Sequence, residues 1–578
     1  MTEDVTIKSF DIKEDLFEKE FLKPFYELSW ADNWPIIDIL NDNKTAYIGE
    51  TYKVKARLKQ HLKNEDKKSL KKINVIIDKK SNKSYTLDME ASLIRYMSAD
   101  TKFDILNSNR GLISHNYYSK DDYRKKFEVD IWPKLQRKGL AERKLIDIQN
   151  DDLFKYSPFV PLDINQSIVV DNLIEVFANY KGKRGSLVVQ GSAGTGKTII
   201  GTYLMKLIHS KEDNFETDSL KEHLETFQNN IKKVALVIPQ QSLRLTLKRV
   251  FKKIHGLNPS MVVSPNDVLK KDYDMLIVDE AHRLRRRKNL TNYSAFDKNN
   301  KELGLGNEGT ELDWILKSSK YQIFFYDQDQ SVKPTDITHS YFLEKVKPLM
   351  LTNNFYELES QFRVQGGSDY IDYVKRVLDC KETEKKHFNK YDLRFYENIT
   401  DMKKVIIEKN NSEGLSRLVA GYGWNWHSKK DISKTDITIE SENFIWNTTH
   451  TDWINSSNSV NEVGCIHTIQ GYDLNYAGII IGPELTYDEE NNKIKVLKEN
   501  YYDTKGKVGI KDEKELEKYI KNIYSVLLSR GINGTYVYVC DSKLREYLRK
   551  FLEQDKESKN YELSKSDNLA IAEKKRKY

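Results

Sequence analysis

The sequence predicts an α/β protein built from several folded domains. At roughly 100–200 residues per domain, its 578 residues correspond to three or four such units. Hydrophobic residues make up 39% of the chain, which is enough to form packed cores and excludes wholesale disorder. From about residue 157 onward, short β-rich runs alternate with segments of helical periodicity, which is the pattern of a parallel sheet with covering helices.

The composition also excludes several classes of protein. No apolar run approaches the ~18 residues that a membrane span requires, and the acidic N-terminal sequence has no apolar core of a secretory signal. The three cysteines (Cys380, Cys465 and Cys540) are far apart and too few for a disulfide framework, so we expect a cytoplasmic location. The net charge of +7 permits a nucleic-acid partner without requiring one.

The N-terminal quarter predicts a small α+β domain and a helical connector. Residues 1–30 are interpreted as a polar lead-in. The domain spans residues 31–118: two apolar runs flank the turn sequence NDNK, an apolar strand follows at 73–77, and helical patterns occupy 53–63 and 86–98. A charged, helical connector is expected over 119–155.

Two further domains are predicted, each around a parallel sheet. Residues 156–345 contain the candidate strands SLVVQ, VALVI, DMLIVD and QIFFYD, and residues 346–550 contain LSRLVA, VGCIHT, AGIIIG and TYVYVC. Polar segments at 210–232, 285–318 and 486–520 are interpreted as insertions that are mobile or contact a partner. A basic tail covers 551–578.

The sequence GSAGTGKT at 191–198 carries the strongest chemical signal. It fits the pattern G-x-x-x-x-G-K-[ST] between the strand SLVVQ and the helix TIIGTYLMKLI, which is the context that a phosphate-binding loop requires. Its glycines let backbone N–H groups surround phosphates at the positive end of a helix: Gly191, Gly194 and Gly196. We expect Lys197 to reach the β- and γ-phosphates of ATP and the Thr198 hydroxyl to ligate Mg²⁺.

Asp279 and Glu280 form the second half of the predicted nucleotide site. They end the apolar strand MLIVD, where the aspartate can hold Mg²⁺ through water and the glutamate can take a proton from the attacking water. An acidic strand end is common by itself. Roughly 80 residues after a phosphate loop, it predicts an ATPase.

Further motifs resemble superfamily 1 helicases, specifically the Schlafen-like group of DNA/RNA helicase domains. PLDINQ is similar to the adenine-binding Q motif, with Gln166 as the base contact, and IPQQSL is similar to motif Ia, which grips the strand. YDQDQ resembles motif III, with Gln330 as the γ-phosphate sensor, and ESQFR resembles motif IV, with Arg363 reaching across the cleft. HTIQGYD looks like motif V, which includes Gly471, and LLSRG looks like motif VI, with Arg530 as a second arginine finger.

The resemblance covers about residues 157–545 and implies two RecA-like domains with nucleic-acid-stimulated ATP hydrolysis and translocation along a single strand. Physical reasoning agrees, because a γ-phosphate held between two sheets needs cations from the far sheet to sense closure. The nearby run GYGWNWH at 421–427 leaves two interpretations open. Its aromatic rings stack on bases, or its tryptophans fill the edge of a core.

Residues 34–110 resemble GIY-YIG endonucleases. Tyr47-Ile48-Gly49 is the second half of that name, Arg57 follows eight residues after Gly49, and His61 follows one helical turn after Arg57. The resemblance implies that Arg57 neutralises the scissile phosphate and that His61 supports the nucleophile.

Glu90 lies in the helical pattern LDMEASLIRYM on the same face as Leu87, Leu93 and Met97, where a carboxylate is costly unless a cation compensates it. In the resembled family the matching glutamate ligates one divalent metal, Mg²⁺ or Mn²⁺. The alternative is a buried glutamate paired with an arginine such as Arg57. The family's final polar residue is expected at Asn107, with Asn109 as the alternative.

The first half of the GIY-YIG motif departs from the family, because Asp38 stands where its tyrosine is expected in WPIIDIL. Three interpretations follow. Asp38 serves as general base, Tyr47 acts alone, or the domain binds nucleic acid without cutting it. We favour retained nuclease activity, because Arg57, His61 and Glu90 would otherwise have no use.

The combined prediction is a metal-dependent endonuclease tethered to an ATP-driven motor that acts on DNA and/or RNA. Such fusions resemble bacterial nuclease–helicase defence proteins, so we expect a role against phage. DNA repair, mobile-element processing or RNA processing would use the same parts. A rival from another class is an ATP-switched binding protein whose N-terminal head recognises nucleic acid.

Overall fold

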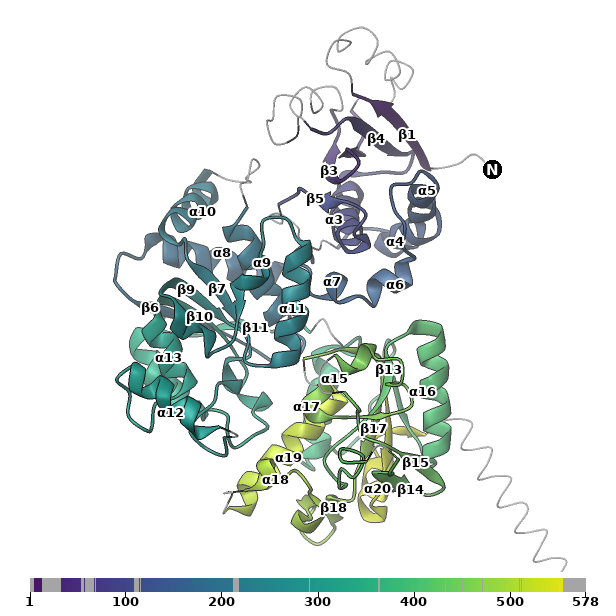
Figure 1. Ribbon diagram of the computed structural model, residues 1–578. Coiled ribbons are helices and arrows are strands. Elements are labelled where there is room, and N and C mark those ends of the chain that lie inside the picture. The colour runs from purple at the N-terminus through teal and green to yellow at the C-terminus, as the bar shows by residue number, and fades with distance from the viewer. Residues whose placement is uncertain are drawn as a thin grey trace, which may run out of the picture. The chain divides into compact units, whose positions relative to one another are not determined.

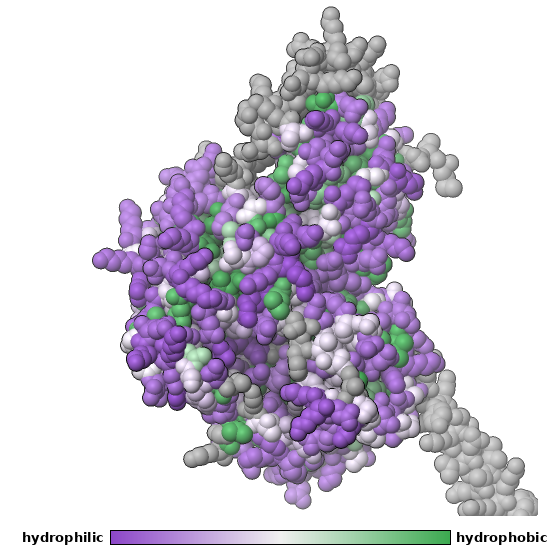
Figure 2. All heavy atoms as spheres, viewed as in Figure 1, coloured by the Kyte–Doolittle hydropathy of each residue, from purple (hydrophilic) through white to green (hydrophobic). Residues whose placement is uncertain are grey.

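The computed structural model describes residues 5–12, 33–53, 57, 67, 69–108, 114, 116–210, 218–290, 292–361, 364–431, 433–449, 452–469, 471–508, 510 and 512–554. The chain packs into two compact units. The first comprises residues 1–182, 198–236 and 246–262, and the second comprises 183–197, 237–245 and 263–578. Within the described segments no helix is both long and apolar enough to cross a bilayer. On the face that Figure 2 shows, hydrophilic side chains dominate and hydrophobic ones occur in small patches.

The first unit opens with a five-stranded sheet in the order β1-β4-β2-β3-β5. Its strands are β1 (Val5–Asp11), β2 (Ile36–Asn41), β3 (Thr45–Thr51), β4 (Lys72–Asp78) and β5 (Asp104–Ile105). β2 and β3 form the predicted antiparallel hairpin, and the Asp42 carboxylate accepts hydrogen bonds from the turn N–H groups of Lys44 and Thr45 at 2.7 and 2.6 Å. Helix α3 (Lys83–Asp100) packs against β3 and begins at Asn82, whose side chain accepts from Tyr85 N at 2.9 Å.

The interpretation of residues 1–30 as a lead-in is wrong for their first part. β1 pairs antiparallel with β4 along its whole length, from Val5 opposite Asp78 to Asp11 opposite Lys72. Val5 and Ile7 are buried while Thr6 is exposed, so the strand has one apolar face. Its sequence, VTIKSFD, contains too few apolar residues for a strong alternating pattern, which is why the strand was missed. Residues 13–32 lie outside the described part of the chain.

The connector over 119–155 is helical, as predicted. It contains α4 (Lys120–Lys126), the π-helical turn η4 (Phe127–Ile131), α5 (Trp132–Arg137), α6 (Leu145–Gln149) and α7 (Asp152–Lys155). Helix α8 (Ile164–Asn179) follows. Helix α10 (Asp218–Asn230) packs against α8, with Phe227 and Phe177 ring centroids 6.3 Å apart, so this part of the segment 210–232 is folded onto the domain rather than a mobile insertion.

The predicted α/β pattern produces a six-stranded sheet in the order β11-β6-β10-β9-β7-β8. The four predicted strands are β6 (Gly185–Gly191), β7 (Val234–Val237), β9 (Tyr273–Val278) and β10 (Ser319–Tyr326). β10 pairs in parallel with β6 and β9, and their near-continuous burial explains the apolar runs in the sequence. The short strands β8 (Val262–Val263) and β11 (Tyr356–Leu358) complete the sheet, and β11 extends it beyond the predicted boundary at residue 345.

The segment 285–318, interpreted as an insertion that is mobile or contacts a partner, is also folded, so the first of these alternatives is wrong for its helices. It contains α12 (Tyr293–Glu302) and α13 (Glu311–Ser318). Trp314 is fully buried and donates from Nε1 to Asn300 Oδ1 at 2.7 Å, and Arg285 Nε donates to Glu311 Oε1 at 2.8 Å. Helix α14 (His339–Val346) follows β10, and its Phe342 ring stacks on Tyr326.

A second six-stranded sheet has the order β16-β13-β17-β20-β12-β21. Its strands are β12 (Asp392–Phe395), β13 (Ser416–Ala420), β16 (Val463–Cys465), β17 (Leu474–Ile481), β20 (Gly531–Val539) and β21 (Glu553–Gln554). The neighbours pair in parallel, as predicted for residues 346–550. β21 lies within the predicted tail, so the fold continues past residue 550.

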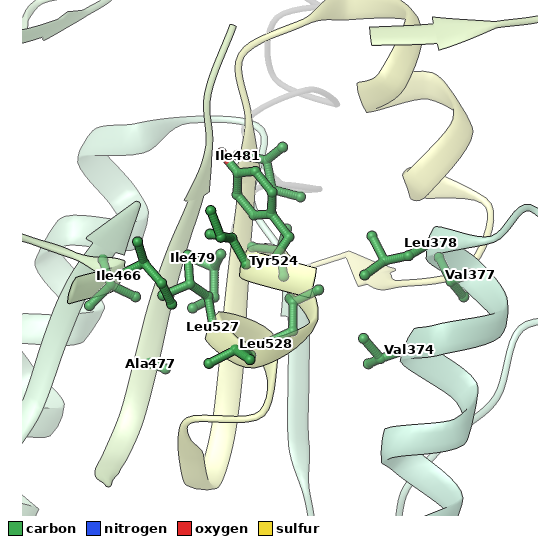
Figure 3. Packing of buried hydrophobic residues seen from close by; sticks show 14 of the residues in the cluster. Val374, Val377, Leu378, Ile466, Ala477, Ile479, Ile481, Tyr524, Leu527 and Leu528 are labelled. Atoms are coloured by element: carbon green, nitrogen blue, oxygen red, sulfur yellow. The ribbon is translucent and has the colours of Figure 1, made fainter. Parts of the chain in front are cut away.

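Alternate residues of the second sheet face two hydrophobic layers. Ile479 and Ile481 face a cluster that includes side chains of α15 (Gly367–Leu378), α19 (Glu513–Leu528) and α20 (Ser542–Arg549). Figure 3 shows Ile479, Ile481, Tyr524 and Leu527 within this layer. Ile480 faces the other layer, which is covered by α16 (Ile399–Glu413), and Figure 1 shows α16 and α19 on opposite sides of β13 and β17.

Smaller elements follow these strands in the second unit. The hairpin β14–β15 (Ile437–Ile439 and Glu442–Phe444) packs on the α16 side. The segment 486–520, interpreted as an insertion, forms most of the hairpin β18–β19 (Leu485–Asp488 and Lys493–Val496), helix α18 (Thr504–Lys507) and the start of α19. The short helix α17 (Ile466–Ile469) directly follows β16.

Candidate functional site

The phosphate loop connects the end of β6 to helix α9 (Lys197–Ile208). Gly194 and Gly196 have φ angles of +85° and +82°, which require glycine, and a Cβ on Gly191 would overlap the Thr195 hydroxyl. Lys197 is 5% exposed, and its Nζ donates to Gly191 O at 2.6 Å and Ser192 O at 2.8 Å. The lysine thus holds the loop in a cradle whose glycines permit close approach of an anion. Thr198 follows on the first turn of α9.

The predicted carboxylates lie at the carboxyl end of β9. Asp279 is fully buried, and its Oδ1 accepts from Glu280 N at 2.9 Å. Glu280 has a left-handed φ of +52°, an uncommon conformation that concentrates at functional sites. Burial alone would raise the pKa of Glu280, but His282, whose Nε2 lies 3.1 Å from Glu280 Oε2, together with Lys197, holds it below its ordinary value. Glu280 is therefore an ionised base beside the phosphate loop.

Asp327 joins the phosphate-loop lysine to the predicted γ-phosphate sensor. Its Oδ2 lies 3.8 Å from Lys197 Nζ and accepts a hydrogen bond from Gln330 Nε2, and all three side chains are nearly buried. The turn is fixed because Asp327 Oδ1 accepts from Asp329 N at 3.0 Å. Asp327 was part of the motif but had no predicted role. Its place directly after the apolar strand QIFFY was the available signal.

The structure describes two of the three site residues that were predicted within 346–550. Gly471 has a φ of +91°, and a Cβ there would lie 3.1 Å from Gln240 Oε1, so this glycine permits close contact between motifs V and Ia. Arg530 is 1% exposed and donates to Val526 O and Tyr472 O, both at 3.2 Å, so these two acceptors of the predicted finger also lie within residues 346–550. Gln361 of motif IV donates to the phosphate-loop carbonyl of Ala193. Arg363 lies outside the described residues.

Gln166 belongs to a capping box at the start of α8. Asp163 Oδ1 accepts from Gln166 N at 2.6 Å, and Gln166 Oε1 accepts from Asp163 N at 3.1 Å. The motif therefore has a structural use in starting this helix. Its adenine contact remains a prediction.

The aromatic run at 421–427 packs against Trp446, which is fully buried. Tyr422 stacks on Trp446 with ring centroids 5.6 Å apart, and the rings of Trp424 and Trp426 lie at 6.3 and 6.2 Å from it. These contacts favour the interpretation of the tryptophans as the edge of a core.

The N-terminal cluster is centred on the β2–β3 hairpin. Asp38 is 2% exposed and pairs across the strands with Gly49, where an added Cβ would lie 3.3 Å from both carboxylate oxygens. The glycine thus leaves room for a buried carboxylate. Arg57 Nη2 donates to Tyr47 OH at 3.2 Å, and Lys67 Nζ lies 3.5 Å from the centre of the Tyr47 ring.

Three carboxylates repel one another in this cluster. Burial, followed by the charges of Glu50 and Asp38, raises the pKa of Glu90 to about 8. Burial is also the largest cause that raises the pKa of Asp38 to about 7, with Arg57 opposing it. Glu50 forms an ion pair with Lys83. Glu90 thus lies beside acids rather than in the simple arginine pair considered as its alternative.

The cluster fits a divalent cation held by few protein ligands. An excess of negative charge at Asp38, Glu50 and Glu90 is the environment that a cation would relieve, and Mg²⁺ commonly uses one or two carboxylates plus water. Among the described residues, no group of three His, Cys, Asp or Glu side chains is arranged to hold a metal. A site here would therefore depend on water ligands.

Of the other residues expected from the GIY-YIG resemblance, the structure describes Asn107. Asn107 is 5% exposed, accepts from Ile48 N at 3.0 Å and donates to Ile48 O at 2.7 Å, so it fixes the backbone of β3 beside Tyr47. His61 lies outside the described residues, as does Asn109. Sequence reasoning missed Glu50, whose signal was its position directly after Tyr-Ile-Gly.

Comparison with known proteins finds one relative and several remote structural similarities. An uncharacterized protein of Saccharomyces cerevisiae is 27% identical over 425 residues, covering 66% of this chain and 87% of that protein. Pif1 helicase from Bacteroides bound to single-stranded DNA is 11% identical with a TM-score of 0.26, covering 66% of this chain and 93% of that one. Pif1 helicase from Candida albicans is 11% identical with a TM-score of 0.27, and the match covers 70% of this chain and 99% of that one.

A family comparison also matches more than half of the chain. The family described as Schlafen group 3, DNA/RNA helicase domain, matches residues 184–541. The match includes the phosphate loop, Asp279, Glu280, Gln330 and Arg530, and it confirms the helicase part of the predicted resemblance. The chain therefore belongs to the Schlafen group 3 DNA/RNA helicase domain family.

Proposed function

We propose that this protein is an ATP-driven motor that translocates on or unwinds DNA or RNA. The observation that carries the proposal is the convergence of Lys197, the ionised Glu280 and the Asp327–Gln330 pair at the ends of three neighbouring parallel strands. This arrangement has the parts that phosphoryl transfer needs: a phosphate cradle, a base and a sensor. Membership of a DNA/RNA helicase family supports nucleic acid as the partner.

Each residue of the nucleotide site has a separate role in ATP hydrolysis. Lys197 exchanges its bonds to Gly191 O and Ser192 O for contacts with the phosphates when ATP binds. Thr198 and Asp279 would hold Mg²⁺, which would supply positive charge against the phosphates. Glu280 orients the attacking water and takes its proton, because its carboxylate is ionised.

Coupling of ATP hydrolysis to nucleic acid uses residues within 346–550. Gln361 already contacts the phosphate loop at Ala193 O, and Gly471 lies against Gln240 of motif Ia. Arg363 and Arg530 act as arginine fingers that complete the site when ATP is bound, a contribution of roughly 10³–10⁵ in rate. Gln166 binds the adenine.

Separate measurements of nucleotide binding and hydrolysis test the motor site. Lys197→Ala is expected to lose both, because the phosphate cradle loses its cation. Glu280→Gln keeps the shape and is expected to bind a fluorescent ATP analogue while hydrolysis falls by roughly 10²–10⁴. Normal hydrolysis by the glutamine variant would exclude Glu280 as the base.

The second function is metal-dependent cleavage of phosphodiesters by the N-terminal unit. It is favoured by three mutually repelling carboxylates, Asp38, Glu50 and Glu90, which lie beside the Tyr47–Arg57 pair. Glu90 would hold Mg²⁺ or Mn²⁺, which would supply positive charge and make water a better nucleophile. Arg57 binds the scissile phosphate. Asp38, with a pKa near 7, accepts a proton from the nucleophilic water directly or through Tyr47 and His61.

Cleavage of labelled single- and double-stranded DNA and RNA, with Mn²⁺ and ATP, tests this second function. Glu90→Gln is expected to abolish cleavage with ATP hydrolysis intact, and Asp104→Asn, an exposed acid of the same sheet, serves as the control. Absence of cleavage by the unmodified protein would favour a recognition head on an ATP-switched binding protein. A cytoplasmic role in defence against phage belongs to the same proposal, and protection of cells from infection should then require both Lys197 and Glu90.

A further inference from the structure

An exposed tyrosine borders the acidic cluster of the N-terminal unit and has no role in the mechanism above. Tyr52 directly follows β3, and its side chain is 48% exposed. A single exposed aromatic residue is ordinary on a protein surface. The neighbours of this ring, however, connect it to the residues proposed to cut phosphodiesters.

Lys83 links the Tyr52 ring to the acidic cluster. Its Nζ lies 5.9 Å from the centre of the ring and forms an ion pair with Glu50. Lys83 begins α3 seven residues before Glu90, so the two side chains lie on the same face of the helix. Burial raises the pKa of Glu90 most, and the charge of Lys83 acts in the opposite direction. The Tyr52 ring therefore lies at the rim of the cluster, on the side where α3 begins.

The backbone that carries Tyr52 is held on both sides. Tyr52 O accepts from Asn33 N at 3.0 Å, and Lys53 N donates to Thr51 Oγ1 at 3.0 Å. Arg57 N donates to Lys53 O, also at 3.0 Å. The tyrosine is thus presented from a fixed backbone, five residues before the arginine expected at the scissile phosphate.

Two ammonium groups lie beside the ring. Lys53 Nζ is 5.5 Å from its centre, and both Lys53 and Lys83 reach solvent. An ammonium group has three N–H donors, so Lys83 can keep its ion pair with Glu50 and also bind a phosphate. An aromatic face with adjacent cations is the combination that binds single-stranded nucleic acid, because a base stacks on the ring while the cations neutralise the backbone. A base inside a duplex has to leave its stack before it can do so.

We propose that Tyr52 stacks on an unpaired base beside the phosphate that the N-terminal unit cleaves, with Lys53 and Lys83 binding phosphates of the same strand. The inference rests on the proposed nuclease function and names its substrate class, a single-stranded or locally unpaired segment. A motor that separates two strands produces such segments, so the inference also gives a reason for joining the two activities in one chain.

Photocrosslinking of the full-length protein to oligonucleotides that carry 5-iodouracil tests the stacking contact, with the crosslinked peptides identified by mass spectrometry. Buffer without divalent metal or ATP prevents cleavage and unwinding during the measurement. A single strand is expected to crosslink at Tyr52, and the same strand in a fully paired duplex at least about fivefold less. Tyr52→Phe keeps the aromatic ring and should keep the crosslink at position 52.

A lysine variant tests the cations without removing the ring. Lys83→Gln is expected to lower the yield at Tyr52 and to make that yield less dependent on salt, because one phosphate contact is lost. Lys44→Gln, at an exposed lysine before the opposite end of β3, is the matched control and should leave both unchanged. Thermal melting checks that each variant is folded.

Cleavage in Mn²⁺ supplies a second readout. Tyr52→Ala should lower kcat/KM for a single strand about fivefold or more, and Tyr52→Phe should restore it. Tyr118→Ala, at a tyrosine of the same unit that is 93% exposed, should have no effect.

The outcomes separate this inference from the nuclease itself. Crosslinks that fall elsewhere while position 52 stays unlabelled would overturn the stacking contact. Equal yields at Tyr52 from the single strand and the duplex would overturn it as well, because the contact would then not need an unpaired base. Labelling of Tyr52 without any cleavage in Mn²⁺ would instead overturn the proposed nuclease and support stacking by a recognition head.

Discussion

Replacement of Asp38 by asparagine tests the electrostatic strain of the N-terminal cluster. Asp38 is 2% exposed, and its pKa is raised from 3.8 to about 7, mainly by burial. At about 1.4 kcal/mol per pKa unit, keeping this carboxylate ionised costs the folded state up to about 4 kcal/mol at pH 8. Solvent screening does not reduce this figure much, because the side chain is buried.

The sign of the pH dependence follows from proton linkage. Above pH 4 the unfolded chain has released the proton of Asp38, whereas the folded chain keeps it until the pH passes about 7. The stability contributed by this group is therefore complete below pH 4 and is lost as the pH rises toward 8. Between pH 5 and pH 8 the loss is about 2–3 kcal/mol, and it should be absent in the asparagine variant.

Hydrogen exchange of the full-length protein gives the opening free energy of β2 and β3, after correction for the intrinsic exchange rate at each pH. Asp11→Asn, an exposed acid on β1 of the same sheet, should keep the pH dependence of the unmodified protein. Millimolar Mn²⁺ should stabilise β2 and β3 more in the unmodified protein than in Asp38→Asn. Equal pH dependence in the unmodified protein and the Asp38→Asn variant would refute the reasoning, because the carboxylate would then ionise normally.

Three further predictions concern the site and the core. Glu90→Gln should raise the melting temperature of the N-terminal unit at pH 8 without metal, because it removes a buried carboxyl whose pKa is about 8, while hydrogen exchange in α3 should lose its response to Mn²⁺. Gly423→Ala should destabilise the second unit by at least 2 kcal/mol in urea unfolding, because the added Cβ would overlap the buried Glu484 carboxylate, and Glu484→Ala should relieve part of that loss. Leu527→Ala should cost about 2–5 kcal/mol in the same assay, since its side chain is fully buried, whereas an effect below about 0.5 kcal/mol is expected for Val508→Ala at a position that is 57% exposed.

Local sequence patterns were sufficient to predict much of the fold. The strands β6, β9, β10, β17 and β20 are continuous apolar runs because they are buried on both faces of a parallel sheet. The phosphate loop was equally clear, since its glycines and lysine occupy adjacent positions in the sequence. β1 was missed because only one of its faces is buried, and its polar residues dominate the sequence VTIKSFD.

Contacts between distant segments could not be predicted in the same way. Nothing in the sequence around Asp503 indicates that it pairs with His467, because no periodicity or spacing connects two side chains that are brought together only by the fold. The same holds for Asp327 beside Lys197 and for Glu50 near Glu90. Polar segments were interpreted as insertions for a similar reason: within 285–318 the few large apolar residues that are buried, Phe296, Leu312, Trp314 and Ile315, are separated by polar and charged stretches.

The most direct test of the motor is steady-state ATP turnover with and without single-stranded DNA or RNA. The account predicts turnover that needs Mg²⁺, increases at least tenfold with one of the strands, and falls in Glu280→Gln whether or not the strand is present. Lys301→Gln, at an exposed lysine on α12, should behave as the unmodified protein. Turnover that responds to neither strand, or that survives in Glu280→Gln, would contradict the assignment of this chain as a nucleic-acid motor driven by ATP.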